Sequence, residues 1–165
     1  MATSKYRNGV AVVLLNESCQ ILVARRPEFE QQWQFPQGGI DEDEDAETAA
    51  FREMEEEIGV VPQLVNLVAA TSQYYSYQYP KHVQQDAFFN RQQYKGQRLQ
   101  FFLFQFLGKD TDIDVRKGPH TEFDSWRWVD FWEPITLVVE FKKIMYESAL
   151  RELERFIVKG SSPIA

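Results

Sequence analysis

The chain of 165 residues has a length that suits one domain, and its 44% hydrophobic and 15% aromatic residues are enough for a sizeable core. This composition argues against a disordered chain, a collagen and a coiled coil, and no apolar run approaches the roughly 20 residues of a membrane-spanning helix. The formal net charge of −7 at first argues against a nucleic-acid partner.

The negative charge is concentrated in one segment. Residues 41–57 include ten acidic residues and one basic residue, whereas the rest of the chain has 15 acidic and 17 basic residues. The protein is therefore a near-neutral body with one acidic segment, which either stays solvated or gathers cations. A single cysteine, Cys19, excludes an intrachain disulfide and a zinc site built on cysteines, and it indicates a reducing, cytoplasmic environment.

Two strands are expected near the N-terminus. The apolar run 10–15 follows Lys5 and Arg7, but polar residues come after it where a signal peptide would have a small-residue cleavage site. We therefore expect a buried strand over 10–15. A second run over 20–24 follows three turn-forming residues, so the pair is predicted to form a hairpin.

The remaining elements follow from hydrophobic periodicity. We predict a helix over 45–58 that ends at Gly59, followed by short strands and one long C-terminal helix. The strands are expected over 64–71, 98–107 and 126–129, and the last helix over 135–157. The polar segment 72–97 resists assignment. Its aromatic and basic residues could contact substrate, but we expect them to be solvated: Tyr74, Tyr75, Tyr77, Lys81, Arg91 and Lys95. This order fits an α/β (α+β) sheet with helices on two sides, in one domain over 1–159 with a frayed tail over 160–165.

Three carboxylates share one stripe of the predicted helix over 45–58. At about 100° per residue, Glu53, Glu56 and Glu57 fall within an arc of about 100°, whereas Glu55 points the opposite way. Like charges at this spacing repel each other, which costs a helix a few tenths of a kcal/mol per pair. A hard cation such as Mg²⁺ would offset this cost. A solvated acidic face is the alternative from the helix alone. An adjoining apolar face would pack on a sheet: Ala50, Phe51, Met54 and Ile58.

The loop before this helix completes a longer pattern. Gly38 and Gly39 follow the run Trp-Gln-Phe-Pro-Gln at 33–37. Nine positions within 23 residues fit G-x5-E-x7-R-E-(apolar)-x-E-E-x-G-(apolar), namely Gly38, Glu44, Arg52, Glu53, Met54, Glu56, Glu57, Gly59 and Val60. Every defined position is filled, which leaves little room for a chance match. The chain therefore resembles the Nudix hydrolases.

This resemblance implies a fold and a chemistry. The Nudix fold is a mixed β-sheet sandwiched between α-helices. Its members hydrolyse a nucleoside diphosphate linked to another group and use Mg²⁺ or Mn²⁺, and more than one ion is expected per site. Metals neutralise and orient the phosphates, so no Ser, Cys or His nucleophile is needed, and His82 and His120 are expected to be structural or exposed. Glu53, Glu56 and Glu57 match the catalytic metal ligands, and one of them would be the general base. Arg52 matches the catalytic residue that orients these carboxylates. Gly38, which would also lie at the metal, Glu44 and Gly59 match structural positions of the motif.

The resemblance extends over about residues 5–157. It is closest to the bacterial RNA pyrophosphohydrolases and to the diadenosine polyphosphate hydrolases of bacteria and plants. In that branch an extra glutamate helps to bind metal, and Glu122 matches it; an ordinary charge at a strand edge is the alternative. The matching segments are Tyr6-Arg7, Ala24-Arg25-Arg26, 33–39, 122–128 and 139–143.

Five further residues match substrate-binding positions of this branch. Arg7 and Arg26 match cationic residues beside the phosphates and the base, because a guanidinium can form paired bonds to phosphate or stack on a base. Phe141 and Lys142 match a base-recognition pair, although Phe141 could equally be a core residue. Gln37 either bonds a phosphate or shapes the turn at Pro36. Two departures from the branch are Asn8 in place of a proline and Asp43 in place of a glycine.

The resemblance implies two candidate substrates. One is RNA with a 5′-triphosphate or diphosphate, converted to 5′-monophosphate RNA in messenger decay. The other is diadenosine tetraphosphate, a dinucleoside polyphosphate that would be split into ATP and AMP. The sequence does not separate them, and no membrane partner is expected. An inactive nucleotide-binding module is a third alternative, but every motif glutamate is present.

Overall fold

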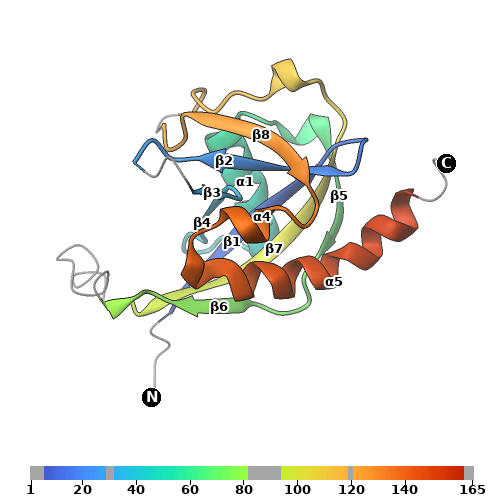
Figure 1. Cartoon of the computed structure of the whole chain (residues 1–165). Coiled ribbons are helices and arrows are strands. Elements are labelled where there is room, and N and C mark those ends of the chain that lie inside the picture. The colour runs from blue at the N-terminus through green and yellow to red at the C-terminus, as the bar shows by residue number, and fades with distance from the viewer. Residues whose placement is uncertain (1–5, 29–31, 82–93, 119–120, 162–165) are drawn as a thin grey trace.

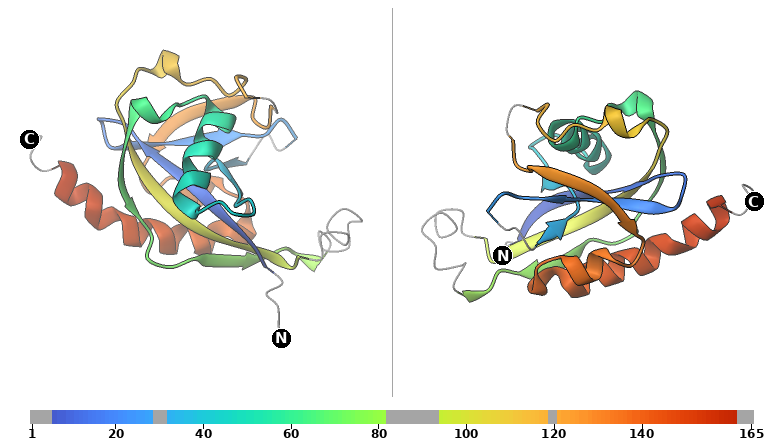
Figure 2. Two further views of the ribbon diagram at one scale, coloured as in Figure 1. Left: turned by 180° about the vertical axis from the view of Figure 1, so that it is seen from behind. Right: turned by 45° about the horizontal axis from the view of Figure 1, so that its top comes forward.

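The computed structural model describes residues 6–28, 32–81, 94–118 and 121–161. Within this part of the chain, one mixed sheet of eight strands lies between helices, as the sequence predicts (Figures 1 and 2). The strands are β1 (Tyr6–Leu15), β2 (Gln20–Arg25), β3 (Trp33–Gln34), β4 (Gln37–Gly39), β5 (Val65–Ala70), β6 (Tyr75–Gln78), β7 (Gly96–Phe106) and β8 (Ser125–Asp130). The helices are α1 (Ala46–Ile58), α4 (Pro134–Leu137) and α5 (Lys143–Ser161), with short 3₁₀ turns at Pro62–Leu64, Asp110–Asp112 and Glu140–Lys142.

The long strands β1 and β7 form the centre of the sheet. They run parallel along their whole overlap, from the Tyr6–Gly96 pair to the Leu15–Gln105 pair. The other strand pairs are antiparallel: the main order is β3-β2-β1-β7-β5, with β4 beside β1, β6 beside β7 and β8 beside β2. The centre is thus a parallel pair, so β1 and β7 are buried on both faces.

The predicted N-terminal hairpin is present, but its strands diverge. β1 and β2 pair at Leu15 and Ile21, and the Asn16 N–H donates to the carbonyl of Gln20 at 2.9 Å. Beyond this point β1 pairs with β4 through Gly9 to Ala11, and β2 pairs with β8 along its whole length. The divergence places β4, the start of the glycine motif, directly against the central strand.

Helix α1 covers one face of the sheet (Figure 2). Its apolar stripe of Ala50, Met54 and Ile58 is fully buried, and the Phe51 ring lies 5.0 Å from that of Phe104. Glu55 is exposed, as the helical wheel predicts. The packing leaves the carboxylate stripe at the edge of the core, so burial of the apolar face aims the carboxylates at β4.

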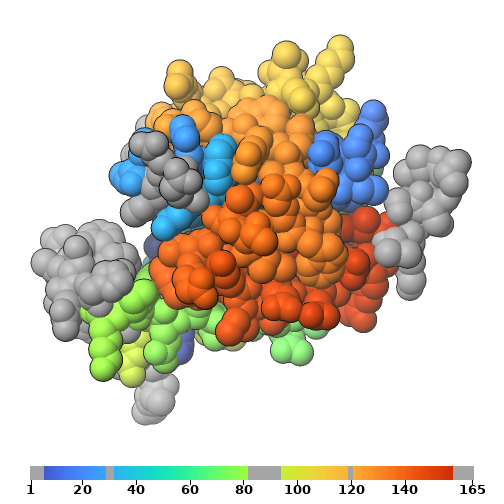
Figure 3. All heavy atoms as spheres, viewed as in Figure 1, coloured from blue at the N-terminus to red at the C-terminus, as the bar shows by residue number. Residues whose placement is uncertain are grey.

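Helix α5 covers the opposite face, and β8, α4 and α5 form most of the surface seen in Figure 3. Tyr146 is fully buried there; its ring stacks on Phe35 at 4.5 Å and its hydroxyl oxygen accepts the Phe35 N–H at 2.9 Å. This contact fastens the C-terminal helix to the segment that leads into β4. No helix in the described ranges is long and apolar enough to cross a membrane.

The prediction of one long C-terminal helix over 135–157 is wrong. α4 begins with Pro134 at its first turn and ends at Leu137, and the backbone of Val138 and Val139 is extended, with ψ of 158° and 146°. β-branched residues favour this conformation, and Val138 is buried in the core beneath α5. The break inserts the 3₁₀ turn Glu140–Lys142, in which Lys142 is buried whereas Glu140 stays exposed.

The prediction of solvated residues in the segment 72–97 is wrong for Tyr75 and Tyr77. Both lie on β6, which pairs with β7; Tyr77 is buried and Tyr75 is half-buried. Lys81 and Lys95 are exposed, as expected, and Arg98 lies over the ring of the half-buried Tyr74. Arg91, His82, His120 and residues 162–165 of the expected tail lie outside the described residues.

Candidate active site

Local signals define both ends of α1. The Asp45 carboxylate accepts the Thr48 N–H at 2.8 Å, and Gly59 ends the helix with φ of +71°, its N–H bonded to the Glu55 carbonyl. A left-handed residue at this position suits glycine, because a Cβ atom disfavours positive φ. The predicted helix over 45–58 is therefore confirmed, with Asp45 as its cap, and the three motif glutamates lie in its last two turns.

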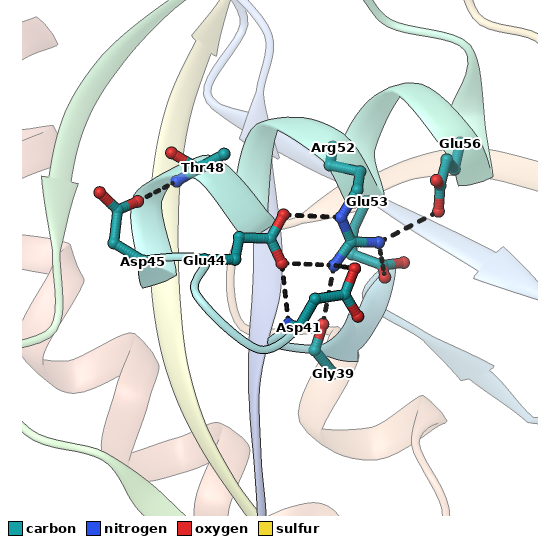
Figure 4. Close-up of polar contacts among 8 residues, drawn as sticks. All are labelled: Gly39, Asp41, Glu44, Asp45, Thr48, Arg52, Glu53 and Glu56. Carbon is teal, nitrogen blue, oxygen red and sulfur yellow. Dashed lines mark hydrogen bonds and ion pairs between the residues drawn. The ribbon is translucent and has the colours of Figure 1, made fainter.

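Arg52 connects the helix to the loop before it (Figure 4). Its guanidinium donates two bonds to Glu44, at 2.8 and 2.9 Å, and one to the Gly39 carbonyl at 2.9 Å. Its Nη1 also donates to Glu53 at 2.8 Å and to Glu56 at 3.3 Å. Bonding to Arg52 lowers the pKa of Glu44. The arginine thus holds two motif glutamates while Glu44 holds the arginine.

Glu53 and Glu57 point from α1 toward β4. A Cβ atom at Gly38 would collide with the carboxylate of Glu53, so glycine makes room for this side chain. The Gln37 N–H donates to Glu57 at 3.1 Å. Glu122, which precedes β8, is exposed but lies close enough to both carboxylates to act on their ionisation. The structure therefore brings the predicted Glu122 to the motif glutamates.

Burial and mutual repulsion oppose ionisation of these carboxylates. Burial raises the pKa of Glu53 to about 7, against the lowering effect of Arg52 and with a further rise from Glu56 and Glu122. Burial raises the pKa of Glu57 well above its usual range, and the charges of Glu122 and Glu53 raise it further. A bound cation would favour the ionised forms of all of these groups.

The donor chemistry fits a hard divalent cation. Four carboxylates from α1 and the segment before β8 lie together, and hard oxygen donors are the ligands that Mg²⁺ prefers. Within the described ranges, no three acidic, histidine or cysteine side chains are arranged as a ready-made metal cage. In this arrangement Glu53 and Glu56 both bond Arg52, so they would turn toward an ion when one binds. The binding of more than one ion at this site stays a prediction.

Cationic side chains lie beside the carboxylates. The guanidinium of Arg7, on β1, lies against Gly39, where an added Cβ atom would collide with it. Arg26, just after β2, is close enough to Lys142 to lower the pKa of its ammonium. These residues come from separate elements that the sheet brings together. The structure thus places Arg7 at Gly39 within the motif and Arg26 near Lys142, and their binding of substrate stays a prediction.

Lys142 lies inside the protein, with 8% of its surface exposed. Its Nζ donates to the Gln37 side-chain oxygen at 3.1 Å and lies 5.4 Å from the centre of the Tyr77 ring. Burial lowers its pKa to about 8, as does Arg26, whereas Glu57 acts in the opposite direction. Phe141 is half-buried, with its ring 5.4 Å from Tyr77, so it is partly a core residue and its base-stacking role stays a prediction.

Two residues extend this group beyond the sequence-based prediction. The Gln97 side-chain oxygen accepts the Gln37 amide at 2.8 Å and also the hydroxyl of Tyr77. Gln97 lies in the segment 72–97, which the sequence leaves unassigned, and the sequence predicts a solvated Tyr77. The alternation of tyrosines at 75, 77 and 79 is a period-2 strand signal that would have placed Tyr77 on one face. No comparable local signal marks Gln97.

Comparison with known proteins shows the family of the chain. The model of the NUDIX domain family matches residues 5–153. The chain belongs to the Nudix family. This match confirms the predicted Nudix fold and a pyrophosphohydrolase that acts on nucleoside polyphosphate-type substrates, in a family that uses divalent metal ions such as Mg²⁺ or Mn²⁺.

Solved Nudix structures have the same fold. An Ap4A hydrolase from C. elegans, solved as a binary complex, is 17% identical with a TM-score of 0.65, and covers 92% of this chain and 98% of its own. The dihydroneopterin triphosphate pyrophosphohydrolase of E. coli is 20% identical with a TM-score of 0.64, covering 93% and 98%. The NUDIX domain of Shewanella oneidensis NrtR, solved with ADP ribose, is 17% identical with a TM-score of 0.53, covering 92% and 89%.

Proposed function

We propose that this Nudix hydrolase converts 5′-triphosphate or 5′-diphosphate RNA into 5′-monophosphate RNA. The observation that supports it is the group of three cationic residues beside the carboxylates: Arg7 against Gly39, and Arg26 near the Lys142 that bonds Gln37. A chain of phosphates carries several negative charges, so it needs cations along its length as well as at the reacting phosphate.

The residues divide into two tasks. Glu53, Glu56, Glu57 and Glu122 would hold Mg²⁺ or Mn²⁺, which when bound withdraws charge from the phosphate oxygens. Arg7, Arg26 and Lys142 would bind the remaining phosphates. Glu57, whose neighbours favour its protonated form, is a candidate to accept a proton from the attacking water once cations lower its pKa.

In this proposal, Phe141 and Arg26 recognise the first base of the RNA substrate. The ring of Phe141 is only half-buried, so part of its face is accessible to a base. Arg26 is close enough to Lys142 to lower its pKa, has 40% of its side chain exposed, and would cover the opposite face of that base. This arrangement would place a nucleoside at the end of the cationic group and its 5′ phosphates over the carboxylates.

A second candidate substrate is diadenosine tetraphosphate, which would be cleaved to ATP and AMP. The acidic loop before α1 favours it, because Asp41, Glu42 and Asp43 are exposed and would repel a long polyanion more than a small one. Both substrates present a polyphosphate attached to a nucleoside, so the same groups would serve either.

A competition assay tests the proposal. The protein is mixed with Mg²⁺ and equal concentrations of a short 5′-triphosphate RNA and diadenosine tetraphosphate, and both sets of products are followed over time. Faster release of pyrophosphate or phosphate from the RNA supports the proposal, whereas faster formation of ATP and AMP supports the second candidate. If neither is hydrolysed, both fail.

A further inference from the structure

The buried amide of Gln97 lies on β7, between β1, which carries the predicted substrate-binding residue Arg7, and β6. In the sheet it is paired with Arg7 of β1 on one side and with Tyr77 of β6 on the other, and it has 8% of its surface exposed. Among the described residues, the Gln97 side chain forms hydrogen bonds with Gln37 and Tyr77, but none with the motif glutamates or Lys142. Any effect on the site therefore passes through the residues that it bonds.

The two bonds to Gln97 determine which way the amide of Gln37 faces. The side-chain oxygen of Gln97 accepts both the Gln37 amide and the Tyr77 hydroxyl, which accounts for the two acceptor positions of a carbonyl oxygen. The Gln37 oxygen is then directed at the ammonium of Lys142, 3.1 Å away. Rotating the Gln37 amide by 180° would set donor against donor at Lys142 and acceptor against acceptor at Gln97.

The orientation of Gln37 matters for Lys142. A buried ammonium is strongly disfavoured unless polar groups compensate for the lost water, and burial has already lowered the pKa of Lys142 to about 8. The Gln37 oxygen supplies such a partner. An ammonium has three donors, so Lys142 can keep this bond and also donate to a phosphate oxygen. The backbone N–H of Gln37 donates to Glu57, so Gln37 contacts both the motif carboxylates and the cationic Lys142.

We propose that Gln97 is a positioning residue for polyphosphate binding, which acts by orienting the Gln37 amide and thereby holding the Lys142 ammonium beside the motif carboxylates. This inference rests on the proposed function, because it assigns Lys142 to the substrate phosphates. The geometry depends on three side chains from β4, β7 and the turn before α5, which only the folded sheet brings together.

Three variants test it. Gln97→Leu removes the acceptor at similar size, whereas Gln97→Glu keeps an acceptor oxygen for both donors. Gln105→Leu is the matched control, because Gln105 lies on the same strand and donates to the Leu15 carbonyl at 3.1 Å, far along β7 from the site. Melting temperatures are measured for all three, and Gln97→Met replaces Gln97→Leu if the leucine variant does not fold.

We expect Gln97→Leu to raise the KM for the better substrate of the competition assay about tenfold, with kcat changed less than about threefold. Gln97→Glu should restore most of the affinity, and Gln105→Leu should leave KM unchanged. A KM for Gln97→Leu equal to that of Gln105→Leu, or a loss in Gln97→Glu as large as in Gln97→Leu, would overturn the proposal.

A binding measurement separates this inference from the proposed function. Inorganic tripolyphosphate is titrated calorimetrically into each protein with Mg²⁺ present. If the wild type hydrolyses neither candidate substrate but binds tripolyphosphate about tenfold more tightly than Gln97→Leu, the proposed function fails and the positioning role stands. If the wild type is active and both proteins bind tripolyphosphate equally, the positioning role fails and the proposed function stands.

Discussion

Replacing Arg52 with methionine tests the central contact of the site. The change keeps much of the aliphatic stem but removes the guanidinium and its bonds to Glu44, Glu53, Glu56 and the Gly39 carbonyl. The side chains of Arg52, Glu44 and Glu53 are 26%, 12% and 10% exposed, so water replaces these bonds poorly. The two glutamates would then lie close together with no cation between them.

The expected loss follows from this burial. Removing one partner of a buried ion pair costs about 3–5 kcal/mol, and the partial exposure of Arg52 favours the lower end of that range. We therefore expect Arg52→Met to lower the free energy of unfolding by about 3 kcal/mol. For a protein of this size, that loss corresponds to a fall in melting temperature of roughly 10 °C.

An exposed arginine provides the control. Arg151 donates to Glu147 at 2.7 Å, as short as any bond of Arg52, but these side chains are 70% and 45% exposed. Arg151→Met should cost about 0.5 kcal/mol or less. Both variants are unfolded with urea in EDTA, and turnover is then measured with Mg²⁺, where Arg52→Met should lose at least about tenfold in kcat.

The outcome distinguishes burial from bond length. If Arg52→Met costs as little as Arg151→Met, the stabilising role assigned to the Arg52 contacts is refuted. If the variant is destabilised as expected but keeps its turnover, Arg52 serves the fold and the orienting role is wrong. A double variant with Glu44→Gln should cost less than the sum of the two single changes, because the two residues share their bonds.

Three further predictions concern the same loop and helix. Glu57→Gln should lower turnover by at least about a hundredfold while the far-ultraviolet circular dichroism stays unchanged, whereas the exposed Glu55→Gln should keep full activity; equal losses in both would contradict the assignment. In EDTA, the free energy of unfolding of the wild type should fall relative to Glu53→Gln between pH 4.5 and about 7, because burial raises the pKa of Glu53 from 4.5 to about 7 and the folded state keeps a proton that the unfolded chain has released. A difference that does not change over this range in urea titrations would show that Glu53 ionises normally. Asp43→Gly should raise the free energy of unfolding by up to about 1 kcal/mol, since Asp43 has φ of +67°, and Glu42→Gly should not; thermal unfolding of both variants checks this.

Asp43 also shows how much local information the sequence carries. It stands where the branch that the sequence resembles commonly has a glycine, and its left-handed backbone explains why a glycine suits that position. In the same way, the spacing of the motif predicts the helix, the Gly59 end and the stripe of Glu53, Glu56 and Glu57, because these features depend on residues only three or four positions apart.

The limits of such patterns appear at the C-terminal helix. Helical spacing over 135–157 predicts one helix, but Val138 and Val139 are extended, since burial of Val138 against the other core residues outweighs local periodicity. The sequence does not predict the strand β6 for a related reason, because its hydrogen bonds go to β7 and its short pattern is weak by itself.

The amino-acid sequence by itself determined the family, the metal-binding motif and the local form of α1, since each is encoded within a short stretch of chain. The tertiary structure decided which side chains meet the motif. Lys142 and Gln37 are 105 residues apart and Gln37 and Gln97 are 60 apart, so their bonds depend on how β4, β7 and the turn before α5 pack. Sequence spacing carries no information on that packing, because hydrogen bonds between distant segments form only when the sheet and the helices on its two faces assemble.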